Sequence, residues 1–500
     1  MRDKAVSRED LLKDIRKNPS FDLIIIGGGA TGLWCALDAT LRGLRTLLIE
    51  KEDFAGETSS RSTKLLHGGL RYLKQGDLSL VKEALYERDL LAKNAKDFVT
   101  KRHFLVPYYS QIDRLTYNIG LWLYDKLARK REENHRVLTK EEVLKLAPTI
   151  EKQGLIGGGL YYDLQFDDAR FAIELAKQIW HAGGYALNYC SLQSFIKEDG
   201  KIKGIKALDE ETGEAFTIHT KAVINAAGVF VDRIRALDNP EEPKILSYSR
   251  GSHIVLPARF LPKDIAIVVP KTKDKRIIFI IPWLGKVLVG TTDVKVESVV
   301  EDPSPSEEEI DFLLELAGQY LSVKPKREDI LAQFAGLRPL VKKKSTQKTS
   351  KLSRTHKIFV GDSNLITIAG GKWTTARHMA EDTVDKVFSV IGEPKRACLT
   401  HTLCFRRDPP KSLQLLDAAL PYTREDIKQA VEEEMALHVS DVLARRTRML
   451  FLDKEKSLLL APKVAALMAS YKKKDSLWIQ REVEAFYRYA KSYQSNRSAA

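Results

Sequence analysis

Short apolar runs and helical patterns alternate along the chain, beginning with a run at residues 21–26. This run, FDLIII, is rich in branched side chains and is typical of a strand buried inside a parallel sheet. Helical spacing follows from about residue 30 to residue 42 and ends at Gly43, since glycine favours a helix C-terminus. A second apolar run occupies residues 44–49. The pattern therefore predicts a parallel strand–helix–strand unit near the N-terminus.

The turn between this first strand and its helix has the spacing G-x-G-x-x-G, at Gly27, Gly29 and Gly32. Gly27 permits the tight turn, Gly29 lets the backbone approach a pyrophosphate, and Gly32 lets helix and strand pack closely. Glu50 ends the second strand, where a carboxylate accepts hydrogen bonds from a ribose diol and would repel a 2′-phosphate. The motif therefore predicts a site for an adenine dinucleotide other than NADP, and it leaves the choice between FAD and NAD open.

The stretch after Glu50 is polar and then helical, and it delays the third strand of the sheet. Such an excursion is more typical of a chain that wraps a large buried cofactor than of a plain NAD domain. Thr58, Ser59 and Ser60 are candidate helix caps within it. Residues 80–95 are expected to form a solvated surface helix, because their helical pattern carries mixed charge.

Two later segments repeat the junction of strand, glycine and helix, at Gly228 and at Gly370. Between them, residues 249–293 form short apolar runs separated by proline and glycine, which is typical of an antiparallel sheet. A further strand at residues 332–340 carries Arg338. A charge in an apolar strand is costly unless it is paired, so a ligand or a carboxylate is expected near this arginine.

We therefore expect three domains after a short N-terminal lead-in. Two separated blocks return to one dinucleotide-binding sheet, an antiparallel substrate domain lies between them, and the glycine-free end of the chain is helical. The expected ranges are 1–20 for the lead-in, 21–75, 151–240 and 355–392 for the dinucleotide-binding domain, 76–150 and 241–354 for the substrate domain, and 393–500 for the helical domain.

The 500 residues carry a formal net charge of +14, with a pI near 9.3. This balance favours anionic partners, which include anionic substrates, lipid headgroups and nucleic acid.

Four cysteines without a C-x-x-C motif indicate a reducing compartment. Cys398, His401 and Cys404 could hold a metal only with a fourth ligand that is not evident. The sequence predicts neither a transmembrane helix nor a secretory signal.

Two basic stretches leave alternatives open. Residues 115–131 place aromatic side chains beside a cluster of lysine and arginine, which suits either a membrane–water interface or a core helix with a basic end. From Arg338 to Lys357 there are eight basic residues and no acidic one. This second stretch is either a solvated face or a contact for phosphate or membrane lipids.

Several stretches together resemble the FAD-dependent glycerol-3-phosphate dehydrogenases of the membrane-associated, quinone-linked kind. The matching stretches span about residues 20–380 and are IIIGGGATG, ETSSRSTKLLHGGLRYL, LWLYDKLARK, FDDARFAIELA, INAAGVFVD, RGSHIVLP, IIFIIPW, GTTDV, FAGLRPL and AGGKWTTARHMAE. KLLHGGLRYL and GSHIVLP are specific to that group, whereas the glycine motif alone is not. The helical C-terminal block is similar as well.

The resemblance implies a fold, an activity and a location. The fold would be α/β, with a glutathione-reductase-like (Rossmann-type) FAD-binding domain, an antiparallel β substrate domain and a C-terminal helical domain. The activity would be oxidation of sn-glycerol 3-phosphate to dihydroxyacetone phosphate, with hydride passing to FAD and electrons to a membrane quinone. The protein would be cytoplasmic and attached peripherally to the inner face of the cell membrane, on an anionic lipid surface. No insert of the kind carried by the oxygen-using oxidase branch is evident, and a homodimer is allowed but not indicated.

The resemblance also implies the site residues. The segment from Lys64 to Tyr72 would lie along the flavin, and the residues that match substrate-site positions are His67, Arg71, Tyr72, Arg338, Arg354 and Lys372. Among these, His67, Arg338 and Lys372 are expected to be catalytic, and no metal is expected. The expected cofactor-binding residues are Gly27, Gly29, Gly32, Glu50, Thr58, Ser59, Ser60, Lys64, Leu66, His67, Gly228, Gly370, Gly371 and Thr374.

These residue types suit the chemistry. His67 could accept the proton of the substrate hydroxyl, since an imidazole has an ordinary pKa of ~6.5, although it could also be a structural histidine. Arg338 and Arg354 could each grip a phosphate bidentately, and Lys372 adds a point charge. A helix that begins after Gly371 could direct its N-terminal N–H groups at the flavin.

Weaker candidates and rival functions remain beside this hypothesis. Tyr248, Thr291 and Asp293 are weaker site candidates, whereas His253 is expected to be a structural hydrogen-bonding residue. A D-amino-acid or glycine oxidase of the same fold class would need one arginine for its carboxylate, so several basic residues favour a phosphate. A nucleic-acid-binding protein with a vestigial dinucleotide fold would suit the basic charge. No aromatic-rich nucleic-acid motif accompanies that charge, so no nucleic-acid partner is expected.

Overall fold

The first apolar run forms β1 (Ser20–Ile26), which pairs in parallel with β2 (Thr46–Ile49) and with β10 (Glu214–Asn225). The last four residues of β1 are buried, as expected of a central strand that is covered on both faces. The computed structural model describes residues 6–69, 78–128, 134–269, 277–342, 356–407 and 414–493.

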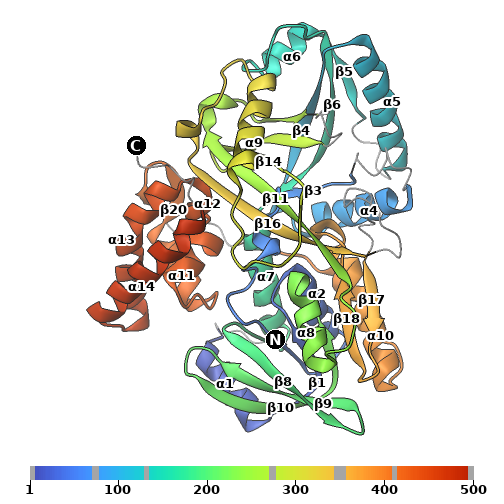
Figure 1. Cartoon of the computed structure of the whole chain (residues 1–500), viewed down its shortest axis with the longest axis vertical. Helices are drawn as coiled ribbons and strands as arrows, with labels where there is room; N and C mark the ends of the chain where they lie inside the picture. The colour runs from blue at the N-terminus through green and yellow to red at the C-terminus, as the bar shows by residue number, and fades with distance from the viewer. Residues whose placement is uncertain are drawn as a thin grey trace.

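The first sheet lies in the lower half of Figure 1 and has eight strands, in the order β17-β18-β10-β1-β2-β7, with β8 and β9 forming a meander beside β10. Its other strands are β7 (Tyr185–Leu187), β8 (Cys190–Glu198), β9 (Lys201–Asp209), β17 (Lys357–Val360) and β18 (Leu365–Ala369). Its helices are α1 (Arg8–Lys17), α2 (Ala30–Leu41), α7 (Asp168–His181), α8 (Val231–Asp238) and α10 (Ala376–Ile391). Because α2 packs against both α7 and α10, its N-terminus is held at the carboxyl edge of the sheet.

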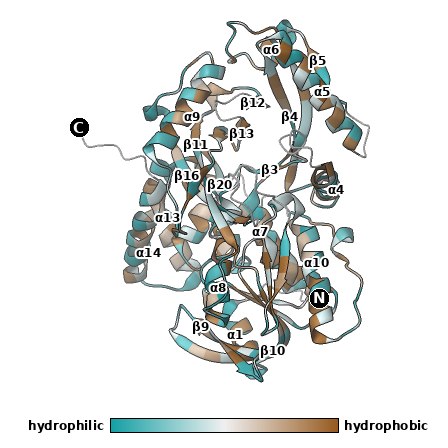
Figure 2. Ribbon diagram, turned by 45° about the vertical axis from the view of Figure 1, so that its right-hand side comes forward, coloured by the Kyte–Doolittle hydropathy of each residue, from teal (hydrophilic) through white to brown (hydrophobic). Residues whose placement is uncertain are grey.

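The second sheet lies above the first in Figure 1 and has ten strands, in the order β15-β11-β14-β13-β12-β4-β6-β3, with β16 paired to β11 and β5 to β6. Every pairing is antiparallel except that of β12 with β4. The strands are β3 (Leu65–Leu66), β4 (Val99–Tyr108), β5 (Arg136–Leu138), β6 (Gly157–Phe166), β11 (Leu246–Pro257), β12 (Ile265–Val269), β13 (Ile278–Trp283), β14 (Lys286–Gly290), β15 (Val294–Val296) and β16 (Ala332–Val341). Figure 2 shows apolar residues along the strands of both sheets.

Four helices accompany the second sheet, namely α4 (Leu78–Asn94), α5 (Gln111–Leu127), α6 (Lys140–Leu146) and α9 (Glu307–Tyr320). Helix α9 begins with a capping box, in which Ser306 and Glu309 each accept a hydrogen bond from the other's backbone N–H group. The expectation that α4 is a solvated surface helix is wrong. Glu87 and Arg88 are buried there, since they pair with Arg377 at 2.6 Å and with Asp163 at 2.7 Å.

Helix α5 has two different faces, so each alternative for residues 115–131 fits part of it. Leu121 and Tyr124 are buried against the sheet. On the other side, the exposed fractions are 76% for Ile112, 65% for Leu115, 57% for Ile119 and 54% for Trp122. These four side chains recur every three or four residues, so they form one apolar stripe directed at solvent, which we call the α5 stripe.

The C-terminal part is helical, as predicted. It contains a hairpin of β19 (Leu415–Asp417) and β20 (Leu420–Thr423), followed by α11 (Arg424–Glu432), α12 (Met449–Leu452), α13 (Lys454–Lys472) and α14 (Ser476–Tyr489). Its contact with the first sheet buries charge: Asp53 lies between Arg445 and Arg446, at 2.5 Å from Arg445 Nε and in hydrogen-bond contact with Arg446. Burial alone would raise the pKa of Asp53, but the two guanidinium groups outweigh it and lower the pKa to about 2.

The predicted fold class is confirmed by these three units. The domain ranges stay a prediction, with one correction. Both β3 and β6 fall within ranges expected to be dinucleotide-binding, yet they pair with each other in the second sheet. The reason is that β6 also pairs along its whole length with β4, which is a stronger determinant than its place in the sequence.

Asp53→Asn should weaken attachment of the C-terminal part by about 3–5 kcal/mol, because it leaves Arg445 and Arg446 buried without a carboxylate. Denaturant unfolding and the resistance of the C-terminal part to protease would measure this. Asp417→Asn is the matched control, since it removes a half-exposed pair with Lys456. An unfolding midpoint and a protease pattern like those of the parent would contradict the assigned role of Asp53.

Candidate active site

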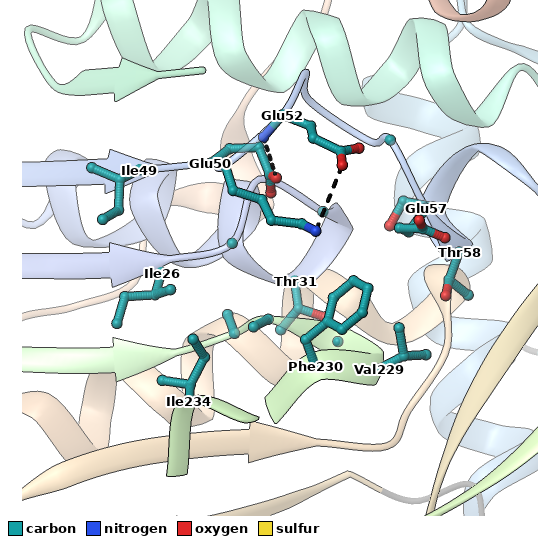
Figure 3. A pocket seen from close by; sticks show the side chains of 18 of the residues that line it. Ile26, Thr31, Ile49, Glu50, Glu52, Glu57, Thr58, Val229, Phe230 and Ile234 are labelled. Atoms are coloured by element: carbon teal, nitrogen blue, oxygen red, sulfur yellow. Dashed lines mark hydrogen bonds and ion pairs between the residues drawn. The ribbon is translucent and has the colours of Figure 1, made fainter. Parts of the chain in front are cut away.

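A first cavity opens at the carboxyl ends of β1 and β2, where α2 begins (Figure 3). Gly27 and Gly29 from the turn and Gly228 after β10 line this cavity. The packing here requires glycine, because a Cβ on Gly32 would lie 1.9 Å from the Gly27 carbonyl oxygen. One on Gly27, whose φ is +112°, would lie 2.7 Å from the Ala226 carbonyl oxygen. The positive end of the α2 dipole is therefore presented to the cavity, as a pyrophosphate requires.

Glu50 lies in the wall of the first cavity at the end of β2 (Figure 3). One carboxylate oxygen accepts from the Gly28 N–H at 2.6 Å, and the other accepts from the Glu52 N–H at 3.0 Å. Burial raises the pKa of this carboxyl to about 7, against the two N–H donors. Hydroxyl donors of a ribose would stabilise the charged form further, so the residue fits the adenosine half of a dinucleotide.

The segment of residues 50–67 separates the first cavity from a second one. Ser59 Oγ accepts from the Ala30 N–H at 2.9 Å, so it caps α2, and Thr58 Oγ1 donates to the Leu337 carbonyl of β16 at 2.7 Å. The Trp373 indole N–H donates to the Ser59 carbonyl at 2.9 Å. Thr58 lines both cavities. The two cavities therefore adjoin at Thr58.

The second cavity lies between the two sheets and contains the three residues expected to be catalytic. His67 follows β3, Arg338 belongs to β16, and Lys372 precedes the 3₁₀ turn Trp373–Thr375. The His67 N–H donates to Thr374 Oγ1 at 3.4 Å. Gly371 and Thr374 also line this cavity. The fold thus places His67 and Lys372, which are 305 positions apart in the chain, in the wall of the same cavity.

Arg338 is oriented by its neighbours on the second sheet. Its Nη2 donates to Thr291 Oγ1 and to the Thr292 carbonyl, both at 3.1 Å, and its Nη1 lies 3.4 Å from an Asp293 carboxylate oxygen. A Cβ on Gly251 would lie 2.3 Å from Arg338 Nη2, so the guanidinium occupies space that only glycine leaves. The carboxylate expected near this arginine is therefore Asp293, and the cation still faces the cavity.

Some predicted cofactor residues line neither cavity. Lys64 Nζ donates to Asp168 at 2.7 Å and to the Ser60 carbonyl at 2.6 Å, among the rings of Trp283, Phe334 and Phe451. These buried partners hold its side chain, and the prediction that Lys64 contacts the cofactor stays a prediction. Ser60, Leu66 and Gly370 also line neither cavity, and Gly32 acts through packing alone.

Three predicted substrate residues, Arg71, Tyr72 and Arg354, lie outside the described residues. Of the weaker candidates, Thr291 and Asp293 line the second cavity and Tyr248 does not. Within the described part of the chain no three histidine, cysteine, aspartate or glutamate side chains form a group that could hold a metal ion. Among the same residues, no helix combines the length and the apolar character that crossing a membrane requires.

The wall of the second cavity also contains His253, which was expected only to be a structural hydrogen-bonding residue, and Asp163, which was not among the expected site residues. His253 Nε2 lies 3.0 Å from Thr63 Oγ1, and its ring stacks on Phe334 with centroids 4.7 Å apart. Burial and the charges of Lys64 and Arg338 hold the pKa of His253 well below its usual range. Side chains alternate between the two faces of a strand along β6 and β11. This alternation groups the residues by face, but it does not show which face of the sheet meets a ligand.

Comparisons with known proteins agree with this arrangement. A family model described as FAD dependent oxidoreductase matches residues 22–385, and one described as the C-terminal domain of alpha-glycerophosphate oxidase matches residues 366–477. The mitochondrial glycerol-3-phosphate dehydrogenase of Mus musculus is 35% identical, over 97% of this chain and 75% of its own length. That of Saccharomyces cerevisiae is 40% identical, over 77% of this chain and 66% of its own length.

A solved structure gives the same result. The glycerol-3-phosphate dehydrogenase of Bacillus halodurans, complexed with FAD, has a TM-score of 0.80 and 28% sequence identity, and the match covers 99% of each chain. The glycine turn, the α2 terminus and Glu50 fit FAD in the first cavity. This chain is a member of the FAD-dependent glycerol-3-phosphate dehydrogenase family.

Proposed function

We propose that this protein oxidises sn-glycerol 3-phosphate at carbon 2 and yields dihydroxyacetone phosphate. One observation carries the proposal: His67, Arg338 and Lys372 line a single cavity, which adjoins the dinucleotide cavity at Thr58. FAD, when bound, supplies an acceptor for the hydride. The chain's own residues must then bind the phosphate, orient carbon 2 and take up the hydroxyl proton.

The phosphate is assigned to the cationic side of the second cavity. Arg338 is held in place by the Thr292 carbonyl and the Asp293 carboxylate, so it can grip phosphate without losing much side-chain entropy. Lys372 adds a second cation on the same cavity wall. Arg71, Tyr72 and Arg354 stay as predicted contributors to this group.

Two acidic wall residues, Asp163 and Asp293, could oppose an anionic substrate, but each is paired, and the partner of Asp293 is Arg338. Asp163 accepts from Arg88 Nη1 at 2.7 Å and from the Tyr124 hydroxyl at 2.9 Å. Both partners are buried, so the carboxylate is paired at short range. The three cations that line this cavity, Arg338, Lys372 and Arg61, are therefore opposed only by carboxylates that already have partners.

His67 is assigned as the acceptor of the hydroxyl proton. Its backbone is held by Thr374, which belongs to the 3₁₀ turn after β18, so the imidazole is positioned by both sheets. Oxidation would remove the hydrogen on carbon 2 as a hydride, for which bound FAD would be the acceptor. The hydroxyl oxygen on that carbon would lose its proton to the His67 imidazole, which leaves a carbonyl group at carbon 2. Phosphate binding and proton removal are thus divided between different residues.

We assign the electron acceptor as a membrane quinone and the α5 stripe as the contact with lipid. The stripe exposes Ile112, Leu115, Ile119 and Trp122, and the exposed cations Arg114 and Lys126 lie on the same helix. Apolar side chains beside cations suit the interface of an anionic bilayer, and the net charge of +14 adds attraction. The protein would then bind peripherally to the cytoplasmic face of the cell membrane.

The function is tested by a half-reaction. Anaerobic mixing of the FAD-loaded protein with glycerol 3-phosphate should bleach the flavin absorbance near ~450 nm, and a quinone analogue should restore it faster than oxygen does. Glycine and proline serve as control substrates and should leave the flavin oxidised. Bleaching by an amino acid but not by glycerol 3-phosphate would favour an amino-acid oxidase instead.

Two variants should separate phosphate binding from chemistry. Arg338→Ala should lower kcat/KM by about two orders of magnitude, mainly through KM, because a charge-assisted phosphate contact is lost.

His67→Ala should retain FAD and slow flavin reduction by about 10²–10⁴-fold, the usual contribution of a general base. Arg327→Ala, which removes an exposed arginine of the same sheet domain, is the matched control. Stopped-flow reduction at the parental rate in His67→Ala would assign the proton to another group.

Replacing Ile119 and Trp122 by serine should abolish sedimentation with anionic vesicles at low salt, while flavin reduction by glycerol 3-phosphate is retained. Leu459→Ser is the matched control, since it removes an apolar side chain that is 80% exposed on α13. Equal sedimentation of the parent and the double variant would remove the α5 stripe from the membrane contact.

A further inference from the structure

Two cations contact one aromatic ring at the adenosine end of the FAD cavity. Lys51 Nζ and Arg233 Cζ each lie 4.7 Å from the centroid of the Phe230 ring. All three residues line the cavity, and Figure 3 shows Phe230 projecting into it near Thr31. Lys51 follows Glu50, and Arg233 belongs to α8, so the ring lies between two separate parts of the first sheet's domain.

A carboxylate from the second sheet's domain joins these two cations. One oxygen of Glu301 lies 2.9 Å from Lys51 Nζ and 3.0 Å from Arg233 Nη1. Glu301 belongs to the loop of residues 297–306, between β15 and α9. This loop therefore extends from the substrate domain to the FAD cavity, where Glu301 contacts two residues of the cavity wall, Lys51 and Arg233.

The same loop is fastened at two further points. Asp302 pairs with Arg61, and its backbone N–H donates to the Glu57 carboxylate at 3.4 Å. Ser304 Oγ donates to the Ser492 carbonyl of the C-terminal part at 2.8 Å. Glu57 also lines the FAD cavity. The loop thus touches all three parts of the chain, and it reaches the wall of the FAD cavity through Glu301, on Lys51 and Arg233, and through the Asp302 N–H, on Glu57.

We propose that Glu301 closes the adenosine end of the FAD cavity by bridging Lys51 and Arg233, and that FAD dissociates only when this bridge opens. Without the Glu301 carboxylate, Arg233 loses this ion pair and Lys51 keeps the longer one to Glu52 at 3.6 Å, so the two cations repel each other across Phe230 and the wall they form can separate. The three side chains are 37–56% exposed, so the bridge is screened by salt. Its effect should therefore be on the rate at which FAD leaves, and should depend on ionic strength.

The test measures FAD release from the holoenzyme, as the rise in flavin fluorescence after dilution. Glu301→Gln should release FAD about three- to tenfold faster than the parent at low salt, the range expected for two half-exposed pairs. In 1 M salt the parental rate should rise toward that of the variant, which should itself change little. Glu297→Gln is the matched control, because Glu297 is in the same loop but pairs only with Lys295 among the described residues.

A second variant distinguishes the bridge from a general loss of stability. Arg233→Gln should also speed release, and the double variant with Glu301→Gln should be no faster than the faster single one, because both remove the same contact. Anaerobic reduction of bound flavin by glycerol 3-phosphate should keep its parental rate in Glu301→Gln. The release of FAD is measured by flavin fluorescence and the oxidation of substrate by flavin absorbance, so a failure of one proposal is distinguished from a failure of the other. Release that is parental or slower in Glu301→Gln, or additive in the double variant, would overturn the proposal.

Discussion

Buried ion pairs behind the segment of residues 50–67 are the constraint on which the site depends. Asp53 is held by Arg445 and Arg446, and the Ser60 carbonyl accepts from Arg448 at 2.7 Å. Charges removed from water are tolerated only when they are paired, so these cations of the C-terminal part and their partners require each other. Thr58 lies in the same segment and faces the two cavities. Docking of the C-terminal part therefore holds the segment that lines both cavities.

The two sheets supply the residues of the two cavities separately. The first sheet presents the α2 terminus and Glu50 to the first cavity, and the second sheet presents Arg338, held by Asp293, to the second cavity, where we propose that the phosphate binds. His67 follows β3, a short strand that passes from the segment into the second sheet. Arg338 is thus on a strand, and His67 and Lys372 lie close to the ends of strands, which limits how far these groups can move apart.

The sequence predicts the parts of this arrangement that depend on local pattern. The β1–α2–β2 unit follows from one apolar run and three glycines, and Arg338 was indicated because a charge in an apolar strand needs a partner. Lys64 could not be placed in this way, since its partner Asp168 is 104 residues away. Helix α4 was misjudged for the same reason: Glu87 is buried through a pair with Arg377, which lies 290 residues further along the chain. Pairing of distant charges leaves no periodic signal.

The central claim is that one flavin spans the junction at Thr58 and meets a phosphate ester held by Arg338 and Lys372. A crystal structure of the FAD-loaded protein with glycerol 3-phosphate, prepared without an electron acceptor, tests it most directly. We predict the flavin ring system beside residues 58–67 and the phosphate in hydrogen-bond contact with both cations. A phosphate bound elsewhere, or a ring system remote from His67, would contradict the account.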